Sequence, residues 1–221
     1  MPKVHLQHVP ISQLIPDSLP DRRNRLLEKG KHLWERPDWK VYHRKGAFSI
    51  EKLMVEGDPI PLLRARASLG SSVNNVADYV ILDKAAQVDW DPTVDQVVEW
   101  AQEGDHRVFQ IPCDTGRIPF LPDRDFVYYE GYHHAPDGSL FSVAESIDAT
   151  QIPALGNSIR GSLRFIMRNV IWLGYDACRL EIIWQTDMGG RLPINQVTSG
   201  SAKSLANEFV HFQQKFGIFK R

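Results

Sequence analysis

Residues 193–216 read PINQVTSGSAKSLANEFVHFQQKF, and this stretch decides the fold. Its large apolar side chains, Leu205, Phe209, Phe212 and Phe216, recur at steps of four, three and four, and together with Ala202 they occupy one side of a helix. Polar residues are expected on the other side: Lys203, Asn207, Glu208, Gln213, Gln214 and Lys215. A stripe with three phenylalanines is wide and flat, and a curved antiparallel sheet is its natural partner. The stretch therefore predicts a long C-terminal helix lying on such a sheet.

The stripe itself has two interpretations. Ordinary core packing is one of them, because most amphipathic helices bury their apolar side in a core. The other is a hollow, since a sheet that curls around one helix can leave space beneath it. A hollow of this kind would be the functional site.

Composition and charge limit the function classes. A chain of 221 residues suits one large domain or two small ones. Its 26 Lys and Arg residues against 27 Asp and Glu residues give a net charge of -1, so no basic field attracts a phosphate backbone and we expect no nucleic-acid partner. The two cysteines are too few for a disulfide framework and fit a reducing compartment.

The amino terminus carries prolines where a signal peptide needs a continuous apolar run. Elsewhere no apolar stretch approaches the roughly 20 residues of a membrane span. We therefore expect a soluble, cytoplasmic protein, and a monomer.

The remaining sequence predicts an α+β domain in the order helix, strands, two helices, strands, helix. Residues 1–17 should form an N-terminal arm over the surface, and 18–221 a single domain. Helical spacing and caps, including Asp91 before Pro92, predict helices over 18–35, 75–82 and 93–101. Alternation and turn residues predict strands over 39–44, 48–55, 62–69, 107–111, 126–132, 140–147, 159–172 and 178–186.

Four stretches, in this order, resemble one known family. They are Val88-Asp89-Trp90-Asp91, Asp123-Arg124-Asp125-Phe126-Val127, Ile159-Arg160-Gly161-Ser162 and Gln185-Thr186-Asp187-Met188-Gly189-Gly190-Arg191-Leu192-Pro193. Together with the final helix they are similar to START (steroidogenic-acute-regulatory-related lipid-transfer) domains, over roughly residues 35–216. The resemblance implies the helix-grip fold, in which a curved antiparallel sheet wraps around the long C-terminal helix and encloses a ligand tunnel.

The same resemblance implies a function. Members of the family bind one lipid, such as a phospholipid, a sterol or another long apolar molecule, and often move it between membranes, with transient contact to a membrane surface. It implies no cofactor and no enzymatic activity. Two alternatives remain: an aromatase/cyclase or hydrolase that uses the cavity as a reaction chamber, and a sensing module that never releases its lipid.

Strand alternation supplies the cavity candidates. Phe126, Tyr128, Glu130 and Tyr132 share one face, which is the inner face if Glu130 points inward; the alternative register leaves Glu130 in solvent. A buried carboxylate would need a donor from Gln110, Tyr128 or Arg164. Trp184 could line the tunnel or, like Trp172, fill the far side of the sheet. The full set of ligand-binding candidates is Gln110, Phe126, Tyr128, Glu130, Tyr132, Arg164, Trp184, Leu205, Phe209 and Phe212.

The resemblance leaves the ligand open. Some sterol-binding members carry a buried pair of an arginine and an acidic residue. Glu130 occupies the position of that arginine here, and Gln110 or Ile111 occupies the position of the acidic residue. Gln87 replaces the arginine that grips phosphate in phosphatidylcholine-binding members. Neither known contact is therefore reproduced.

Enzyme motifs are missing from the sequence. It has no HExxH, GxSxG, Walker or GxGxxG pattern, and no metal site is predicted. His133 and His134 should decorate an exposed turn, and Cys113 should be inert.

Other conspicuous residues have structural explanations beside functional ones. Charges at strand starts usually hold loops, so we expect this role for Arg124, Asp125 and Arg160. Gly189, Gly190 and Gly200 could be hinges, although the adjacent pair could simply form a turn. A basic cluster on the first helix should be a solvated face, with docking to anionic lipid as the alternative: Arg22, Arg23, Arg25, Lys29 and Lys31.

Overall fold

A computed structural model describes residues 3–7, 9–46, 48–115, 122–190 and 192–219. Its strands are β1 (Lys3–Leu6), β2 (Lys40–Lys45), β3 (Phe48–Leu53), β4 (Leu62–Leu69), β5 (Gln96–Glu103), β6 (His106–Cys113), β7 (Arg124–His134), β8 (Leu140–Ser146), β9 (Ile159–Arg160), β10 (Ser162–Gly174) and β11 (Ala177–Asp187). They form one 11-stranded sheet in the order β1-β5-β6-β7-β8-β10-β11-β4-β3-β2, with β9 beside β7. The pairing is antiparallel except for β1 with β5 and β9 with β7.

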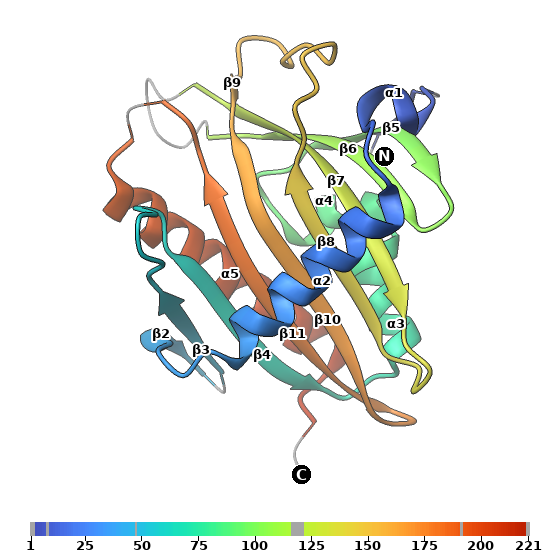
Figure 1. Ribbon diagram of the computed structural model, residues 1–221. Helices are drawn as coiled ribbons and strands as arrows, with labels where there is room; N and C mark the ends of the chain where they lie inside the picture. The colour runs from blue at the N-terminus through green and yellow to red at the C-terminus, as the bar shows by residue number, and fades with distance from the viewer. Residues whose placement is uncertain (1–2, 8, 47, 116–121, 191, 220–221) are drawn as a thin grey trace.

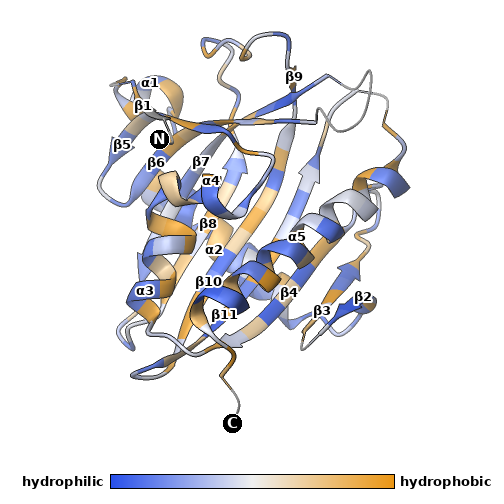
Figure 2. Ribbon diagram, turned by 180° about the vertical axis from the view of Figure 1, so that it is seen from behind, coloured by the Kyte–Doolittle hydropathy of each residue, from blue (hydrophilic) through white to orange (hydrophobic). Residues whose placement is uncertain are grey.

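Helices cover both faces of this sheet. They are α1 (Ile11–Leu14), α2 (Leu19–Glu35), α3 (Val73–Ala77) with its π-helical continuation η1 (Asp78–Leu82), a short 3-10 turn η2 (Lys84–Ala86), α4 (Gln87–Trp90) and α5 (Ile194–Phe216). Helix α2 crosses one face of the sheet, called here the outer face (Figure 1). Helices α3, α4 and α5 lie on the opposite, inner face (Figure 2). The predicted α+β helix-grip architecture, a curved sheet around a C-terminal helix, is confirmed.

Helix α2 begins and packs as its sequence dictates. The Ser18 hydroxyl accepts a hydrogen bond from the Asp21 N–H, and Pro20 occupies the first turn, where its missing N–H costs nothing. Gly30 faces β10 so closely that a Cβ there would lie 2.2 Å from the Met167 sulfur. The helix thus lies directly on the sheet, with Leu26 buried beneath it.

The basic cluster of α2 makes contacts within the protein, although Arg25, Lys29 and Lys31 are exposed as predicted. Arg22 and Arg25 both form ion pairs with Glu145, at 2.9 and 3.1 Å, and Arg23 donates to the Tyr132 carbonyl. Burial lowers the pKa of Lys29, whose ammonium lies 4.6 Å from the centre of the Phe165 ring. These contacts account for four of the five basic residues without a membrane.

The helix predicted over 93–101 is wrong, because β5 occupies this segment. Asp91 does act as a local cap, but its Oδ1 accepts hydrogen bonds from the Thr93 N–H and hydroxyl, at 3.0 and 2.6 Å, and closes a turn instead of a helix. The β-branched pair Val97 and Val98 then favours a strand, which pairs with both β6 and β1. Tertiary pairing here overrides a local capping pattern.

The first seventeen residues add an edge to the sheet. Strand β1 runs parallel to β5, and the short α1 buries Ile11 and Leu14 in the outer core. The division into an arm and a single domain stays a prediction. Among the described residues, no helix combines the length and apolar character needed to cross a membrane.

Candidate functional site

A cavity of about 420 Å³ lies between the inner face of the sheet, helix α5 and the segment 87–94. Its volume falls within the range of about 300–1,000 Å³ typical of ligand pockets. Most of its wall is apolar and comes from β6, β7, β10, β11 and the region of α4: Trp90, Val94, Ile111, Phe126, Leu163, Ile166, Ile182 and Trp184. The predicted hollow beneath the last helix is present.

The cavity reaches the surface at one end of α5. Four residues of its wall are exposed: Pro92, Asp114, Gln196 and Gly200. They belong to the turn after α4, the end of β6 and the first half of α5. The opening therefore lies where these three segments approach one another.

Helix α5 presents two different stripes to the sheet. Its N-terminal half, residues 194–204, lines the cavity with small or polar side chains: Gln196, Val197, Gly200, Ser201 and Ser204. Its C-terminal half, residues 205–216, fills the core instead, except that Glu208 also lines the cavity. Leu205, Phe209 and Phe212 have no exposed surface, and the Phe209 ring lies 5.3 Å from that of Phe48.

The structure brings three of the ten candidate residues to the cavity wall, namely Phe126, Tyr128 and Trp184. Their role in binding a ligand stays a prediction. Seven candidates are not part of the wall: Gln110, Glu130, Tyr132, Arg164, Leu205, Phe209 and Phe212. The apolar ones among these seven, and Tyr132, belong to the core cluster beneath α5. The aromatic stripe of α5 therefore fills the core beside the cavity and does not line it.

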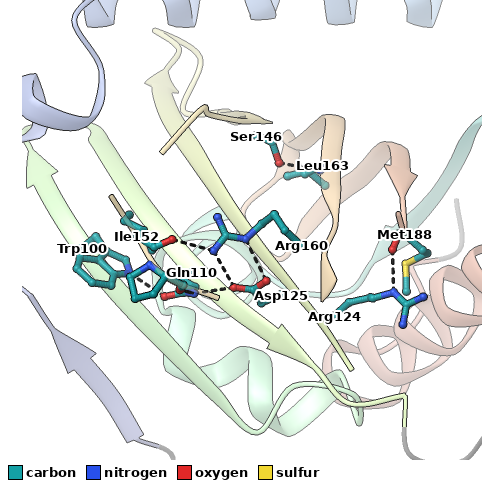
Figure 3. Close-up of polar contacts among 10 residues, drawn as sticks. Trp100, Gln110, Arg124, Asp125, Ser146, Ile152, Arg160, Leu163 and Met188 are labelled. Atoms are coloured by element: carbon teal, nitrogen blue, oxygen red, sulfur yellow. Dashed lines mark hydrogen bonds and ion pairs between the residues drawn. The ribbon is translucent and has the colours of Figure 1, made fainter. Parts of the chain in front are cut away.

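Gln110 lies on the opposite side of its strand, in a polar network at the outer face. Its Nε2 donates to Asp125 at 2.7 Å and to the Pro153 carbonyl, while its Oε1 accepts from Trp100 (Figure 3). Arg160 completes the network through an ion pair with Asp125 at 3.0 Å. These bonds hold the loop that contains Pro153 against β7, which agrees with the role of holding loops expected for Asp125 and Arg160.

Arg124 and Arg164 hold segments that lead into α5. The Arg124 side chain is buried and its Nε donates to the Met188 carbonyl at 2.8 Å (Figure 3). Arg164 bridges Asp58 and Asp187, with both ion pairs at 2.7 Å. Gly189 and Gly190 follow with φ of 65° and 72°, so they form the tight turn that glycine permits. Movement at this turn stays a prediction.

Glu130 points inward, as one of the two registers predicted, and it is completely buried. Its carboxylate forms ion pairs with Lys84 at 2.5 Å and Arg168 at 3.5 Å, and it accepts a hydrogen bond from the Ser142 hydroxyl. Burial opposes ionisation of Glu130, but its two cationic partners outweigh burial and hold its pKa below the ordinary value. Burial lowers the pKa of Lys84 to about 8 against the opposing attraction of Glu130.

Sequence reasoning missed several polar residues that do reach the cavity, among them Gln87, Asp91, Arg168 and Glu208. Glu208, predicted on the solvent side of α5, is only 4 % exposed, and that prediction is wrong. The spacing of Glu208 from two serines in the sequence could have predicted its position. Glu208 follows Ser204 by four residues and Ser201 by seven, so it lies on the cavity stripe and not opposite the core.

The electrostatics of Glu208 follow from this position. Burial raises the pKa of its carboxyl to about 8; the negative charge of Asp91 adds to this, and Arg168 opposes it. Cys113 also lines the cavity, and burial raises the pKa of its thiol to about 11, so it carries little thiolate at neutral pH. His133 and His134 are exposed, as predicted. Within the described ranges, no group of three or more His, Cys, Asp or Glu residues is arranged to hold a metal ion.

Comparison with known proteins decides the family. A family model for the START domain matches residues 27–217, which is most of the chain. The chain belongs to the START domain family. No curated protein matches this START domain significantly in sequence.

Solved structures agree with the fold of this START domain. Human StAR-related lipid transfer protein 5 superposes with a TM-score of 0.80 at 20 % identity, over 88 % of this chain and 94 % of that one. The human StarD13 (DLC2) lipid transfer and protein localization domain gives 0.72 at 19 %, over 87 % and 95 %. A STAR-related lipid transfer protein from Xanthomonas axonopodis gives 0.62 at 18 %, over 79 % and 98 %. At these identities the likeness establishes the shared fold.

Proposed function

We propose that this START domain binds a single lipid molecule in its cavity and carries it between membranes without chemically changing it. The observation that carries the proposal is the apolar cavity of about 420 Å³ enclosed by the sheet and the N-terminal half of α5. Several proteins of the same fold are lipid transfer proteins by name. Their names support transfer as the function, and the cavity supplies the place.

The energetics of such a cavity favour an apolar ligand. Burying about 400 Å² of lipid surface contributes roughly 10 kcal/mol before entropy costs, at about 25 cal/mol per Å². A wall of this kind can therefore compete with a bilayer for one molecule. The modest volume fits a compact or single-chain lipid better than a phospholipid with two long chains. Release requires transient contact with a membrane surface and opening near the start of α5.

A transfer assay tests the proposal. The purified protein should extract fluorescent single-chain lipid or sterol from donor liposomes and deliver it to acceptor liposomes, and native mass spectrometry should find one bound molecule per chain. The Gly200→Leu variant, which places a side chain at the opening of the cavity, should lose most of this transfer. Failure of all lipid classes to move, together with turnover of a cavity ligand to a product of different mass, would establish the cyclase or hydrolase alternative instead.

A further inference from the structure

A second and much smaller hollow lies beside the main cavity, on the side of β4. Its volume is about 10 Å³, and its wall includes Ile60, Pro61 and Leu63 around the start of β4 together with part of the N-terminal half of α5. A space of this size is barely enough for one water molecule. Four residues belong to the walls of both hollows and therefore stand between them: Trp184, Thr186, Val197 and Ser201.

Trp184 is the largest of these four residues. Its indole packs against two apolar clusters, the core beneath α5 and the cluster that contains Leu163 and Ile166 of the cavity wall. The indole Nε1 donates a hydrogen bond to the hydroxyl of Thr186, and because Thr186 lies on the same strand β11, this bond fixes the ring to the sheet. Trp184 is only partly buried, which agrees with a hollow on each side of it.

A partition of this kind acts on the length of an apolar ligand. Each methylene group that a lipid chain buries in apolar surroundings strengthens binding by about fourfold. A chain that already reaches a close-packed aromatic wall gains nothing from a further methylene, because overpacking introduces strain. The indole of Trp184 would therefore set a chain length beyond which affinity stops rising.

We propose that Trp184 determines the length of the apolar chain that the cavity accepts, by closing the cavity against the smaller hollow beside β4. This inference rests on the proposed function, since it concerns the lipid that the same cavity takes. Trp184 acts by excluding volume, so a smaller side chain at this position would join the two hollows. The joined space would extend between Leu63 and Val197.

A series of 1-alkanols from octanol to hexadecanol tests the assignment. The dissociation constant of each alkanol would be measured by displacement of a fluorescent apolar dye from the full-length protein. In the natural protein the affinity should rise about fourfold per methylene and then level off at one chain length. In Trp184→Ala this limiting length should increase, and hexadecanol should bind about tenfold or more tightly than it binds the natural protein, as expected for roughly two more buried methylenes.

Two further variants show whether the effect depends on the volume of residue 184. Trp184→Phe removes only part of the ring system, so it should increase the limiting length by less than Trp184→Ala does. Trp172→Ala is the matched control, because it makes the same exchange at an exposed tryptophan of β10 that belongs to neither wall, and it should leave the limiting length unchanged. Circular dichroism and thermal unfolding would show which variants are folded, and Trp184→Phe carries the test if Trp184→Ala does not fold.

The possible outcomes separate this proposal from the proposed function. An unchanged limiting length in the folded Trp184 variants would overturn the role of Trp184 and leave lipid binding intact. An equal increase in Trp172→Ala would also overturn it, because the change would then reflect general loosening of the protein. Affinity that rises up to hexadecanol in the natural protein would show that Trp184 sets no limit. No displacement by any alkanol, combined with no lipid transfer, would overturn the proposed function itself.

Discussion

The two halves of α5 lie against the same sheet, but one half fills the space between helix and sheet and the other leaves it open. The C-terminal half places Phe209 and Phe212 in a core that leaves them no exposed surface. The N-terminal half presents Gly200, Ser201 and Ser204, whose small side chains leave a cavity of about 420 Å³. One continuous helix is therefore anchored at one end and hollow beneath the other.

Side-chain size along one helix can therefore separate a region that fills the core from a region that leaves a cavity. Helical period fixes which residues face the sheet, and both halves obey it. Whether the gap between helix and sheet is filled depends on the volumes at those positions, because a protein interior tolerates few accidental voids. Under the proposed function, the filled half holds the helix while the hollow half admits a ligand and opens.

The largest expected effect comes from emptying the filled half. Phe209→Ala removes a fully buried ring in contact with Phe48 and should lower the free energy of unfolding by about 3–5 kcal/mol. Gln214→Ala, at an exposed position of the same half, should change it by less than about 0.5 kcal/mol. Urea unfolding followed by tryptophan fluorescence measures both. Equal effects of the two variants would contradict the anchoring role of this half.

The charged cluster beside the cavity can be broken at Glu130, whose partner Arg168 lines the cavity. Glu130→Gln removes the anion that pairs with buried Lys84 and Arg168, and it should lower the free energy of unfolding by up to about 3–5 kcal/mol. The matched control is Glu51→Gln, because Glu51 pairs with Arg64 at a comparable 2.6 Å but near the surface. That control should lose at most about 1 kcal/mol. Similar losses of unfolding free energy in the two variants would show that burial does not increase the effect of breaking the Glu130 ion pairs.

Much of the fold was predictable because it depends on periodic patterns. The aromatic stripe placed the last helix at 193–216, within a residue of α5, and alternation put Glu130 on one face with Phe126, Tyr128 and Tyr132 without deciding which face that is. The START motifs supplied the helix-grip architecture. Each of these features is repeated over several turns or strands, so one misleading residue cannot erase it.

The site was less predictable because it depends on what the packing leaves empty. Leu205, Phe209 and Phe212 look equally suited to filling a core and to lining a tunnel, and only the sheet opposite them decides. Small polar residues such as Ser201 resemble any surface position. Glu208 was assigned to solvent by its charge, although its spacing from Ser201 and Ser204 indicated the cavity.

A pH dependence should distinguish the cavity stripe from the core stripe. The pKa of Glu208 is raised by burial to about 8 in the folded state, so between its ordinary value of 4.5 and about 8 the folded protein holds a proton that the unfolded chain releases. The Glu208 contribution to stability is therefore complete below 4.5 and is lost as the pH rises towards about 8. The slope is at most about 1.4 kcal/mol per pH unit.

Glu208→Gln should remove this part of the pH dependence and leave the rest. Urea unfolding at about pH 5.5 and about pH 7.5 would show a smaller difference for the variant than for the natural protein. Lys84 should act above this window, because its pKa is lowered to about 8 and its contribution rises with pH between about 8 and 10.5. An unchanged slope in Glu208→Gln would place the Glu208 carboxyl in contact with solvent.

The smallest effect on stability, with a large effect on binding, is expected from filling the hollow half. Gly200 lies at the opening of the cavity and a Cβ there meets no atom within 4 Å, so Gly200→Leu should obstruct the opening without a clash. Replacing glycine inside a helix favours folding by up to about 1 kcal/mol, while lipid transfer should fall by about tenfold or more. Ser199→Leu, exposed and next to it, is the matched control and should transfer lipid normally. Full transfer by Gly200→Leu would show that the ligand does not occupy this half, and the division of α5 into an anchor and a hollow would lose its functional meaning.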